Sequence, residues 1–388
     1  MKITNIVEKT ISIASQIKNS VIDFSTMTIS VVAVHTDYKI DGKPVIGLGF
    51  NSNGRYAVGG ILRERIIPRL LKADPKDLQD DEKENLDPYK CWNAMMKNEK
   101  PGGHGERSVA VGTIDMAIWD IIAKIEQKPL YQLLGERYRD GKYTNEVYTY
   151  AAGGYYYPGK DIIKLQEELK KYLDMGFSEV KIKVGGVTQN EDMKRIESAI
   201  AIVKEGKNLA VDVNGRFELK QALDFLEAIE PYKLKWYEEP VDPLDYLSTA
   251  AIAQNSETPI ATGENIFSFI DSRNLIRYGG LNPDRDVLQM DPVLSYGLVE
   301  YFRILNMLEQ NGWSAARCIP HGGHQFGLHL AGGLGFYGNE SYPEVFYPFG
   351  KFADGMTIEN GKVKLLDYPG IGYEFVPEIY KIMNELCD

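Results

Sequence analysis

The chain has 388 residues, of which 44% are hydrophobic and 26% charged, and its formal net charge is −11. The ordinary charged fraction excludes global disorder, and at roughly 150 residues per domain the length favours two domains. The acidic balance argues against nucleic acid and anionic membranes as partners, so a small anionic substrate would need a local cationic or metal site.

The first 135 residues predict an α+β domain. Runs rich in β-branched residues at 3–13, 26–36 and 45–50 favour an antiparallel meander of three strands. Helical periodicity follows at 61–71 and 109–125. We therefore expect residues 1–135 to form a domain of their own.

A regular alternation of strands and helices begins near residue 147. The strand-like runs are 146–151, 179–184, 209–213, 234–237, 259–262, 286–290 and 315–319. The amphipathic stretches between them are 161–173, 191–203, 219–229, 267–278 and 296–310. Short connections between strand and helix predict parallel βαβ units, and seven such units favour a (β/α) barrel over residues 136–340. Residues 341–388 lack this rhythm, and we expect them to return to the first domain.

The cysteines and the N-terminal segment indicate the cellular compartment in which the protein is expected. Cys91, Cys318 and Cys387 are far apart in the sequence, and no CxxC pair occurs, so neither a disulfide framework nor a structural zinc site is expected. Glu8 and Lys9 interrupt any apolar signal segment, and no run approaches the ~20 apolar residues that span a bilayer. We expect a soluble cytoplasmic protein.

Ionisable residues stand where the predicted barrel strands end. They are Lys181, Lys183, Asp212, Glu238, Glu264, Asp291 and His321. From Lys183 onward, consecutive members lie 26 to 30 residues apart, which is about one βα unit. Because barrel active sites lie at the C-terminal ends of the strands, we expect these side chains to share one site.

Three carboxylates, Asp212, Glu238 and Glu264, belong to adjacent strands of this set. Like charges in one barrel mouth repel unless they are protonated or neutralised by a cation. Hard oxygen ligands with room for water and substrate suit Mg²⁺. The alternative is that each residue caps the helix that follows its strand, which explains one carboxylate more easily than three in register.

Lys181 and Lys183 are two residues apart on one strand, so both point to the same face, about 6–7 Å apart. Two ammonium groups at that distance disfavour double protonation, which predicts a lowered pKa for one or both and a base near neutral pH. The alternative is a solvated strand edge.

His321 follows a strand end, and Asp291 stands one strand earlier. A carboxylate bonded to one ring nitrogen fixes the tautomer and favours the imidazolium, so the other nitrogen can donate or accept a proton. For His35, His324 and His329 we expect structural roles.

Five segments in this order, KIKVGG, AVDVNGRF, WYEEP, ATGEN and CIPHGGHQ, resemble the mandelate racemase subgroup of the enolase superfamily. The resemblance implies an α+β capping domain over a modified (β/α)7β barrel. Further segments at 49–56, 98–117, 150–160 and 338–343 extend the likeness over essentially the whole chain, and they are similar to dehydratases of tartrate within that subgroup.

The resemblance implies Mg²⁺ as cofactor, bound by Asp212, Glu238 and Glu264. It makes Lys183 the base, with Lys181 beside it, and His321, backed by Asp291, the acid. Substrate contacts are implied for Asn53, Lys100, Tyr155, Lys181 and Glu340, and on less distinctive surroundings for Asn19.

The implied reaction removes the proton next to a carboxylate, forms a metal-stabilised ene-diolate and expels hydroxide, converting D-tartrate to oxaloacetate and water. The expected partner is a small dicarboxylate, and homo-oligomers, often octamers, are usual in the subgroup. Three alternatives stay open: a dehydratase or epimerase of another acid sugar, a Schiff-base aldolase using Lys183, and a non-catalytic acid-sugar binder that keeps the metal site.

Overall fold

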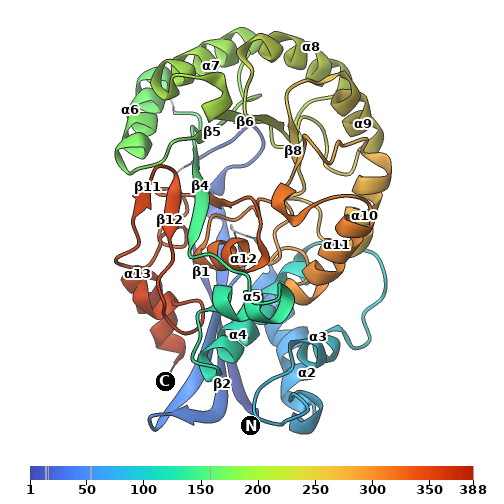
Figure 1. Ribbon diagram of the computed structural model, residues 1–388, viewed down its shortest axis with the longest axis vertical. Coiled ribbons are helices and arrows are strands. Elements are labelled where there is room, and N and C mark those ends of the chain that lie inside the picture. The colour runs from blue at the N-terminus through green and yellow to red at the C-terminus, as the bar shows by residue number, and fades with distance from the viewer. Residues whose placement is uncertain (14, 16, 53–54, 158, 388) are drawn as a thin grey trace.

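The computed structural model describes residues 1–388 except 14, 16, 53, 54, 158 and 388. A barrel forms the upper part of the molecule in Figure 1, and a three-stranded sheet with its helices forms the lower part, where both chain ends lie. In the part of the chain that is described, no helix is both long and apolar enough to cross a membrane.

The N-terminal sheet has the order β1-β2-β3 with antiparallel pairing, as the sequence predicts. Its strands are β1 (Ile3–Ser12), β2 (Thr28–Ile40) and β3 (Lys43–Phe50). Helix α4 (Glu106–Ile125) packs against β3, and it is buried along most of its length. A Cβ at Gly47 would lie 2.0 Å from the backbone oxygen of Ala117, so glycine is required for this close approach.

The other helices of this module are short. The predicted helix 61–71 is a continuous helical segment made of α1 (Val58–Ile61), a π-helical turn η2 (Leu62–Ile66) and α2 (Ile67–Lys72). Two further helices, α3 (Pro88–Met96) and α5 (Leu130–Tyr138), have nine residues each. Three turns of helix give too few repeats for the period to stand out in the sequence, and neither helix was predicted.

The barrel strands follow one another in sequence order around the sheet. They are β4 (Glu146–Gly153), β5 (Val180–Lys183), β6 (Leu209–Asp212), β7 (Trp236–Glu238), β8 (Ile260–Thr262), β9 (Val287–Leu288) and β10 (Asn339–Ser341). Parallel pairing of β10 with β4 and a bridge between Leu288 and Cys318 close the ring. This is the expected modified (β/α)7β barrel.

Seven helices cover the barrel. They are α6 (Asp161–Asp174), α7 (Gln189–Val203), α8 (Leu219–Ile229), α9 (Tyr246–Asn255), α10 (Phe269–Tyr278), α11 (Leu298–Gln310) and α12 (Gln325–Leu334). The predicted strand 315–319 is wrong. Ala315–Arg317 forms a 3-10 turn, because the Ser314 side chain accepts a hydrogen bond from the amide of Ala316, and only Cys318 makes a strand-like bridge.

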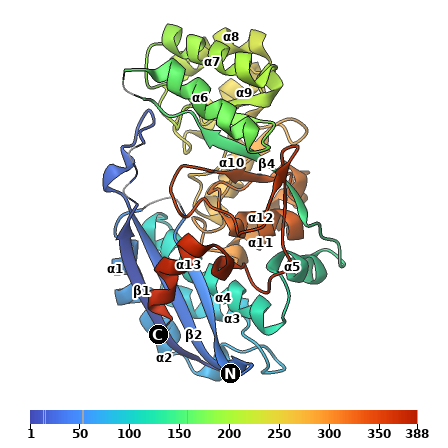
Figure 2. The ribbon, with the colours of Figure 1, turned by 90° about the vertical axis from the view of Figure 1, so that its left-hand side faces the viewer.

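The C-terminal segment contacts both modules (Figure 2). Its hairpin, β11 (Ile358–Glu359) and β12 (Lys362–Lys364), pairs with β4 of the barrel. Helix α13 (Pro377–Met383) then packs against β2, and the ring Nε2 of His35 lies 2.8 Å from the backbone oxygen of Leu386. Cys91 and Cys318 are buried free thiols.

Candidate active site

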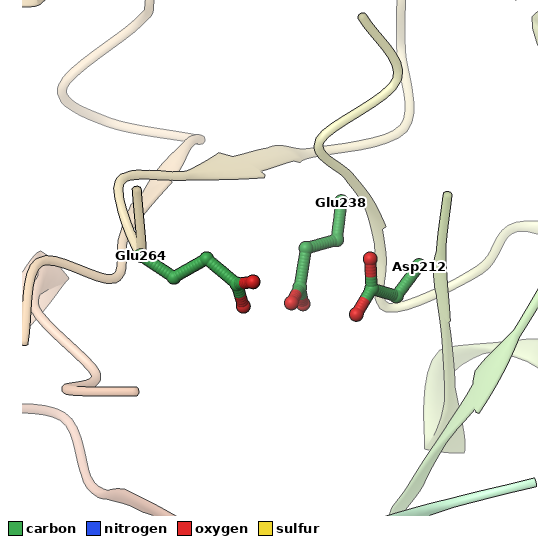
Figure 3. Close-up of side chains that lie close together, drawn as sticks. All are labelled: Asp212, Glu238 and Glu264. Carbon is green, nitrogen blue, oxygen red and sulfur yellow. The ribbon is translucent and has the colours of Figure 1, made fainter. Parts of the chain in front are cut away.

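The site begins with the register of three neighbouring barrel strands. Lys183, Asp212 and Glu238 are each the last residue of their strand, and they are direct partners across β5, β6 and β7. Parallel register therefore places these three side chains at one level of the barrel mouth. Glu264 follows two residues after β8, and its side chain reaches the same level (Figure 3).

The three carboxylates form a compact cluster. Asp212, Glu238 and Glu264 each offer one oxygen, and these oxygens lie within 4.8 Å of one another. Asp212 and Glu238 are fully buried, and Glu264 nearly so. Burial and the nearby charge of Asp212 raise the pKa of Glu238, although the Lys181 ammonium opposes this shift. Three hard oxygen donors in this state fit a divalent cation such as Mg²⁺.

The prediction of a lowered pKa for Lys181 or Lys183 is wrong for this structure, although the charge of Lys181 does oppose that of Lys183. Burial does oppose their charge, but carboxylates outweigh it: Asp212 raises the pKa of Lys183, and Glu238 and Glu340 raise that of Lys181. Lys183 Nζ donates a hydrogen bond to Asp212 Oδ2, and Lys181 Nζ lies 2.5 Å from Glu238 Oε1. The sequence predicts one shared site for these lysines and acids, but not how close each acid lies to a lysine.

His321 lies at the other end of the triad. Its Nε2 is 3.7 Å from Glu264 Oε2, and its Nδ1 is 3.3 Å from Asp291 Oδ2. Burial opposes the imidazolium, but the charge of Glu264 and the hydrogen bond to Asp291 outweigh it, so the pKa of His321 is raised. A charged ring at this position is a proton donor.

The other histidines have structural partners. His324 Nδ1 accepts from the amide of Gly327 and caps α12, and the ring of His329 bonds backbone groups of Tyr131 and Ile371.

Two of the expected substrate contacts lie beside the lysines. Glu340 Oε1 is 2.7 Å from Lys181 Nζ, and the Tyr155 ring centroid is 5.4 Å from Lys183 Nζ. A cavity of about 730 Å³ reaches the triad at Glu264, and Lys183, Tyr155 and His321 line it as well. Asn19 also lines it, although its side-chain oxygen accepts hydrogen bonds from the amides of Val21 and Ile22.

The two capping-domain contacts are placed differently. Lys100 is exposed and is not among the described residues that line the cavity. Asn53 lies outside the described residues. The structure therefore brings Tyr155, Lys181 and Glu340 to the site and leaves Lys100 apart from it.

Arg55, Glu106 and Arg216 line the cavity, and the sequence reasoning missed them. The Arg55 guanidinium lies 5.8 Å from the ring centroid of Phe267, and Arg216 Nη1 donates to the backbone oxygen of Ser20. Each arginine ends an Asn-Gly-Arg tripeptide shortly after a strand. That repeated tripeptide in the sequence is the signal that could have found them.

A second missed group holds the triad in place. Trp236 Nε1 and Gln289 Nε2 donate to Glu238 Oε2 at 2.7 and 2.8 Å. Asn265 Nδ2 bonds both oxygens of the buried Glu239 and lies 3.3 Å from Glu264 Oε1. These partners fix the direction in which the carboxylates point.

An α+β module over a (β/α)7β barrel, with carboxylates ending three adjacent strands, defines a member of the enolase superfamily. Residues 164–379 match the family model described as "Enolase C-terminal domain-like", and residues 2–135 match the "Mandelate racemase / muconate lactonizing enzyme, N-terminal domain". The chain belongs to the mandelate racemase / muconate lactonizing enzyme family, which confirms the resemblance at the level of the enolase superfamily.

Several relatives are acid-sugar dehydratases. An arabinonate dehydratase from Saccharolobus solfataricus is 31% identical over 326 residues, 80% of this chain and 79% of the relative. An L-talarate/galactarate dehydratase from Salmonella typhimurium is 27% identical over 88% of this chain and 80% of its own. The structure of an L-talarate dehydratase from Polaromonas sp. JS666, complexed with Mg and L-glucarate, matches with a TM-score of 0.76 and 26% identity over 95% of this chain and 92% of that chain.

Proposed function

We propose that this protein is a Mg²⁺-dependent acid-sugar dehydratase, a carbon–oxygen lyase, and that its substrate is D-tartrate. One observation carries the proposal. Lys183 pairs with Asp212 at one end of the buried carboxylate triad, and His321 lies beside Glu264 at the other end. Both Lys183 and His321 line the same cavity. Dehydration through an ene-diolate can use a base for the proton next to the carboxylate and a separate acid for the leaving hydroxyl, and this pair of residues would supply both.

Asp212, Glu238 and Glu264 would hold the Mg²⁺. When bound, the ion acts as a Lewis acid that stabilises the negative charge formed on the substrate carboxylate, a contribution of several kcal/mol in such sites. The Lys181 ammonium, which already pairs with Glu238 and Glu340, can donate to the same carboxylate and hold it in place.

Lys183 would remove the proton next to that carboxylate. Its Nζ is paired with Asp212, and this partner raises its pKa, so the pair has to open and the ammonium has to release a proton before the nitrogen can accept one. The nearly complete burial of Lys183, 3% exposed, keeps water away from the abstracted proton.

His321 would complete the reaction. Its Nε2 proton passes to the hydroxyl on the next carbon, which leaves as water with the electrons of the C–O bond. The electrons of the ene-diolate form the new C=C bond, and the resulting enol of a tartrate substrate becomes oxaloacetate. The Asp291 carboxylate orients the ring and stabilises its charged form.

The choice of D-tartrate rests on four segments that resemble D-tartrate dehydratase: 49–56, 98–117, 150–160 and 338–343. They contain Asn53, Lys100, Tyr155 and Glu340, for which we propose substrate contacts, and Asn19 joins them at the cavity wall. The relatives favour the second candidate, dehydration of a longer acid sugar, since arabinonate and talarate are the substrates named for them. The cytoplasmic location and the homo-oligomer stay predictions.

The test is a substrate panel. Purified protein with Mg²⁺ is incubated with D-, L- and meso-tartrate, arabinonate, galactarate and talarate, and the keto acid products are quantified. D-tartrate alone should give rapid oxaloacetate formation. Faster dehydration of a longer acid would make that acid the proposed substrate. Borohydride trapping of substrate on Lys183, together with activity that resists EDTA, would instead identify the protein as a Schiff-base aldolase.

Two variants assign the roles within that panel. Lys183→Ala and His321→Asn should each abolish turnover while Mg²⁺ binding and melting temperature stay near those of the parent. Lys207→Ala is the matched control, because the Lys207 side chain is 69% exposed and pairs with Glu205 at the surface. Near-normal turnover in either site variant would refute its assigned role.

A further inference from the structure

Asp291, the partner of His321, receives a buried hydrogen bond from the other module. Its Oδ1 accepts from the amide of Val293 at 2.8 Å. Its Oδ2 accepts from Ser52 Oγ at 2.6 Å, and the same oxygen faces His321 Nδ1 at 3.3 Å. Ser52 and Asp291 are both 0% exposed. The serine hydroxyl is therefore a close and water-free partner of the oxygen that orients the proposed acid.

The N-terminal sheet holds Ser52 firmly. Ser52 lies two residues after β3, and the neighbouring Asn51 is bonded to β2 by its amide, 3.1 Å from the backbone oxygen of Ser30, and by its side chain, which accepts from the amide of Ser30. The ring of Phe50 packs edge-on against His324, with 5.7 Å between centroids. These contacts anchor the chain just before Ser52, so the position of its hydroxyl depends on the N-terminal sheet.

The loop that carries His321 fits closely against this hydrogen bond. Gly322 has φ +117°, and a Cβ built on it would lie 2.8 Å from both Ser52 Oγ and Asp291 Oδ2. Any side chain at this position would push apart the serine, the aspartate or the loop, so glycine is what permits the contact.

We propose that Ser52 is a positioning residue for the acid of the reaction. By occupying one lone pair of Asp291 Oδ2, the hydroxyl directs the other towards His321 Nδ1 and holds the ring with Nε2 facing the cavity. This inference rests on the proposed dehydration, in which that Nε2 proton joins the departing hydroxide to form water. Because Ser52 belongs to the N-terminal module and Asp291 to the barrel, the acid is complete only when the two modules are packed together.

The kinetic test uses Ser52→Ala, which removes the hydroxyl, and Ser52→Cys, which keeps the shape but donates weakly. Dehydration kcat should fall roughly 10- to 100-fold in both variants, with KM changed by less than about threefold. Exchange of the substrate α-proton in D₂O, which needs Lys183 and not His321, should stay within about threefold of the parent. Ser52→Thr, which restores a hydroxyl, should recover most of the loss in kcat.

Ser272→Ala is the matched control, because Ser272 is equally buried but donates to the backbone oxygen of Ser268 on α10. Its kinetics should match the parent. A parent-like kcat in Ser52→Cys, or equal losses in α-proton exchange and dehydration in Ser52→Ala, would overturn the proposal and leave Ser52 a packing residue.

A second readout needs no substrate. The chain has five histidines, so ¹⁵N-histidine spectra are simple, and assignment by His321→Asn identifies the Nδ1 proton that faces Asp291. This resonance should be protected from exchange in the parent and in Ser272→Ala, and lost in Ser52→Ala. An unchanged resonance in Ser52→Ala would refute the positioning role. If the parent dehydrates no acid sugar but the resonance is lost as described, the proposed function fails while Ser52 still positions the ring.

Discussion

His329, at the middle of α12, should make the stability of the protein depend on pH. Its Nε2 lies 3.0 Å from the backbone oxygen of Ile371, and its Nδ1 accepts from the amide of Tyr131 at 3.2 Å. This pair of contacts fits the neutral ring with its proton on Nε2, because a second proton on Nδ1 would face the N–H of Tyr131. Burial thus lowers the pKa of His329 from 6.5 to about 4.

The sign follows from which state binds the proton first. As pH falls, the unfolded chain takes up the proton at pH 6.5, whereas the folded protein resists until about pH 4. The neutral ring therefore stabilises the fold fully above pH 6.5, and this contribution is lost between pH 6.5 and 4. The difference between 6.5 and about 4 corresponds to about 3 kcal/mol, of which about 2 kcal/mol is lost by pH 5.

The assay compares the parent with His329→Gln, whose amide can make the same two contacts without titrating. Melting temperature and amide hydrogen exchange of α12 are followed from pH 7.5 to pH 5. The variant can be less stable at every pH, so the measured quantity is the difference in slope. Equal slopes for parent and variant would refute the assignment of a neutral buried ring at this position.

Four further outcomes are expected. Removal of divalent metal with EDTA should abolish activity, and Mg²⁺ should restore it; persistent activity without metal would exclude the triad as a metal site. Lys183→Ala should lower α-proton exchange roughly 10²- to 10⁴-fold, measured by deuterium incorporation, without weakening Mg²⁺ binding. Gly322→Ala should lower stability by about 1–3 kcal/mol, because its Cβ would crowd Asp291, and an unchanged melting temperature would contradict this. If Lys100 binds a second carboxylate, Lys100→Met should impair the turnover of diacids far more than that of monoacids. If Arg55, one of the cations that line the cavity, has that role instead, Arg55→Met should have this effect. The ratio of kcat/KM for diacids to kcat/KM for monoacids, measured in both variants, decides between them.

The barrel and its metal-ligand candidates were predictable because they depend on local patterns. Short β-branched runs at regular spacing give strands, and parallel register then carries Lys183, Asp212 and Glu238 to one level. The wrong strand prediction at 315–319 has a local cause as well, because the hydrogen bond from the Ala316 amide to the Ser314 side chain favours a 3-10 turn there.

Other features depend on contacts between distant segments, and no pattern in the sequence reveals them. Ser52 and Asp291 are 239 residues apart, so nothing near either residue indicates that they meet. The direction of the pKa shift of Lys181 is decided by Glu238 and Glu340, which come from other strands. Lys100 lies in a segment that resembles a substrate-binding loop, but its position depends on how that loop packs.

The contact between His35 and Leu386 joins residues 351 positions apart. The entropy cost of closing so long a loop makes this contact slow to form. The C-terminal segment therefore covers its side of the N-terminal sheet only after most of the polypeptide has been made. During synthesis β2 would leave apolar side chains uncovered until α13 is made, which favours chaperone binding or aggregation at this strand. Weakening the α13 docking contact should therefore lower the yield of folded protein before it changes any catalytic constant.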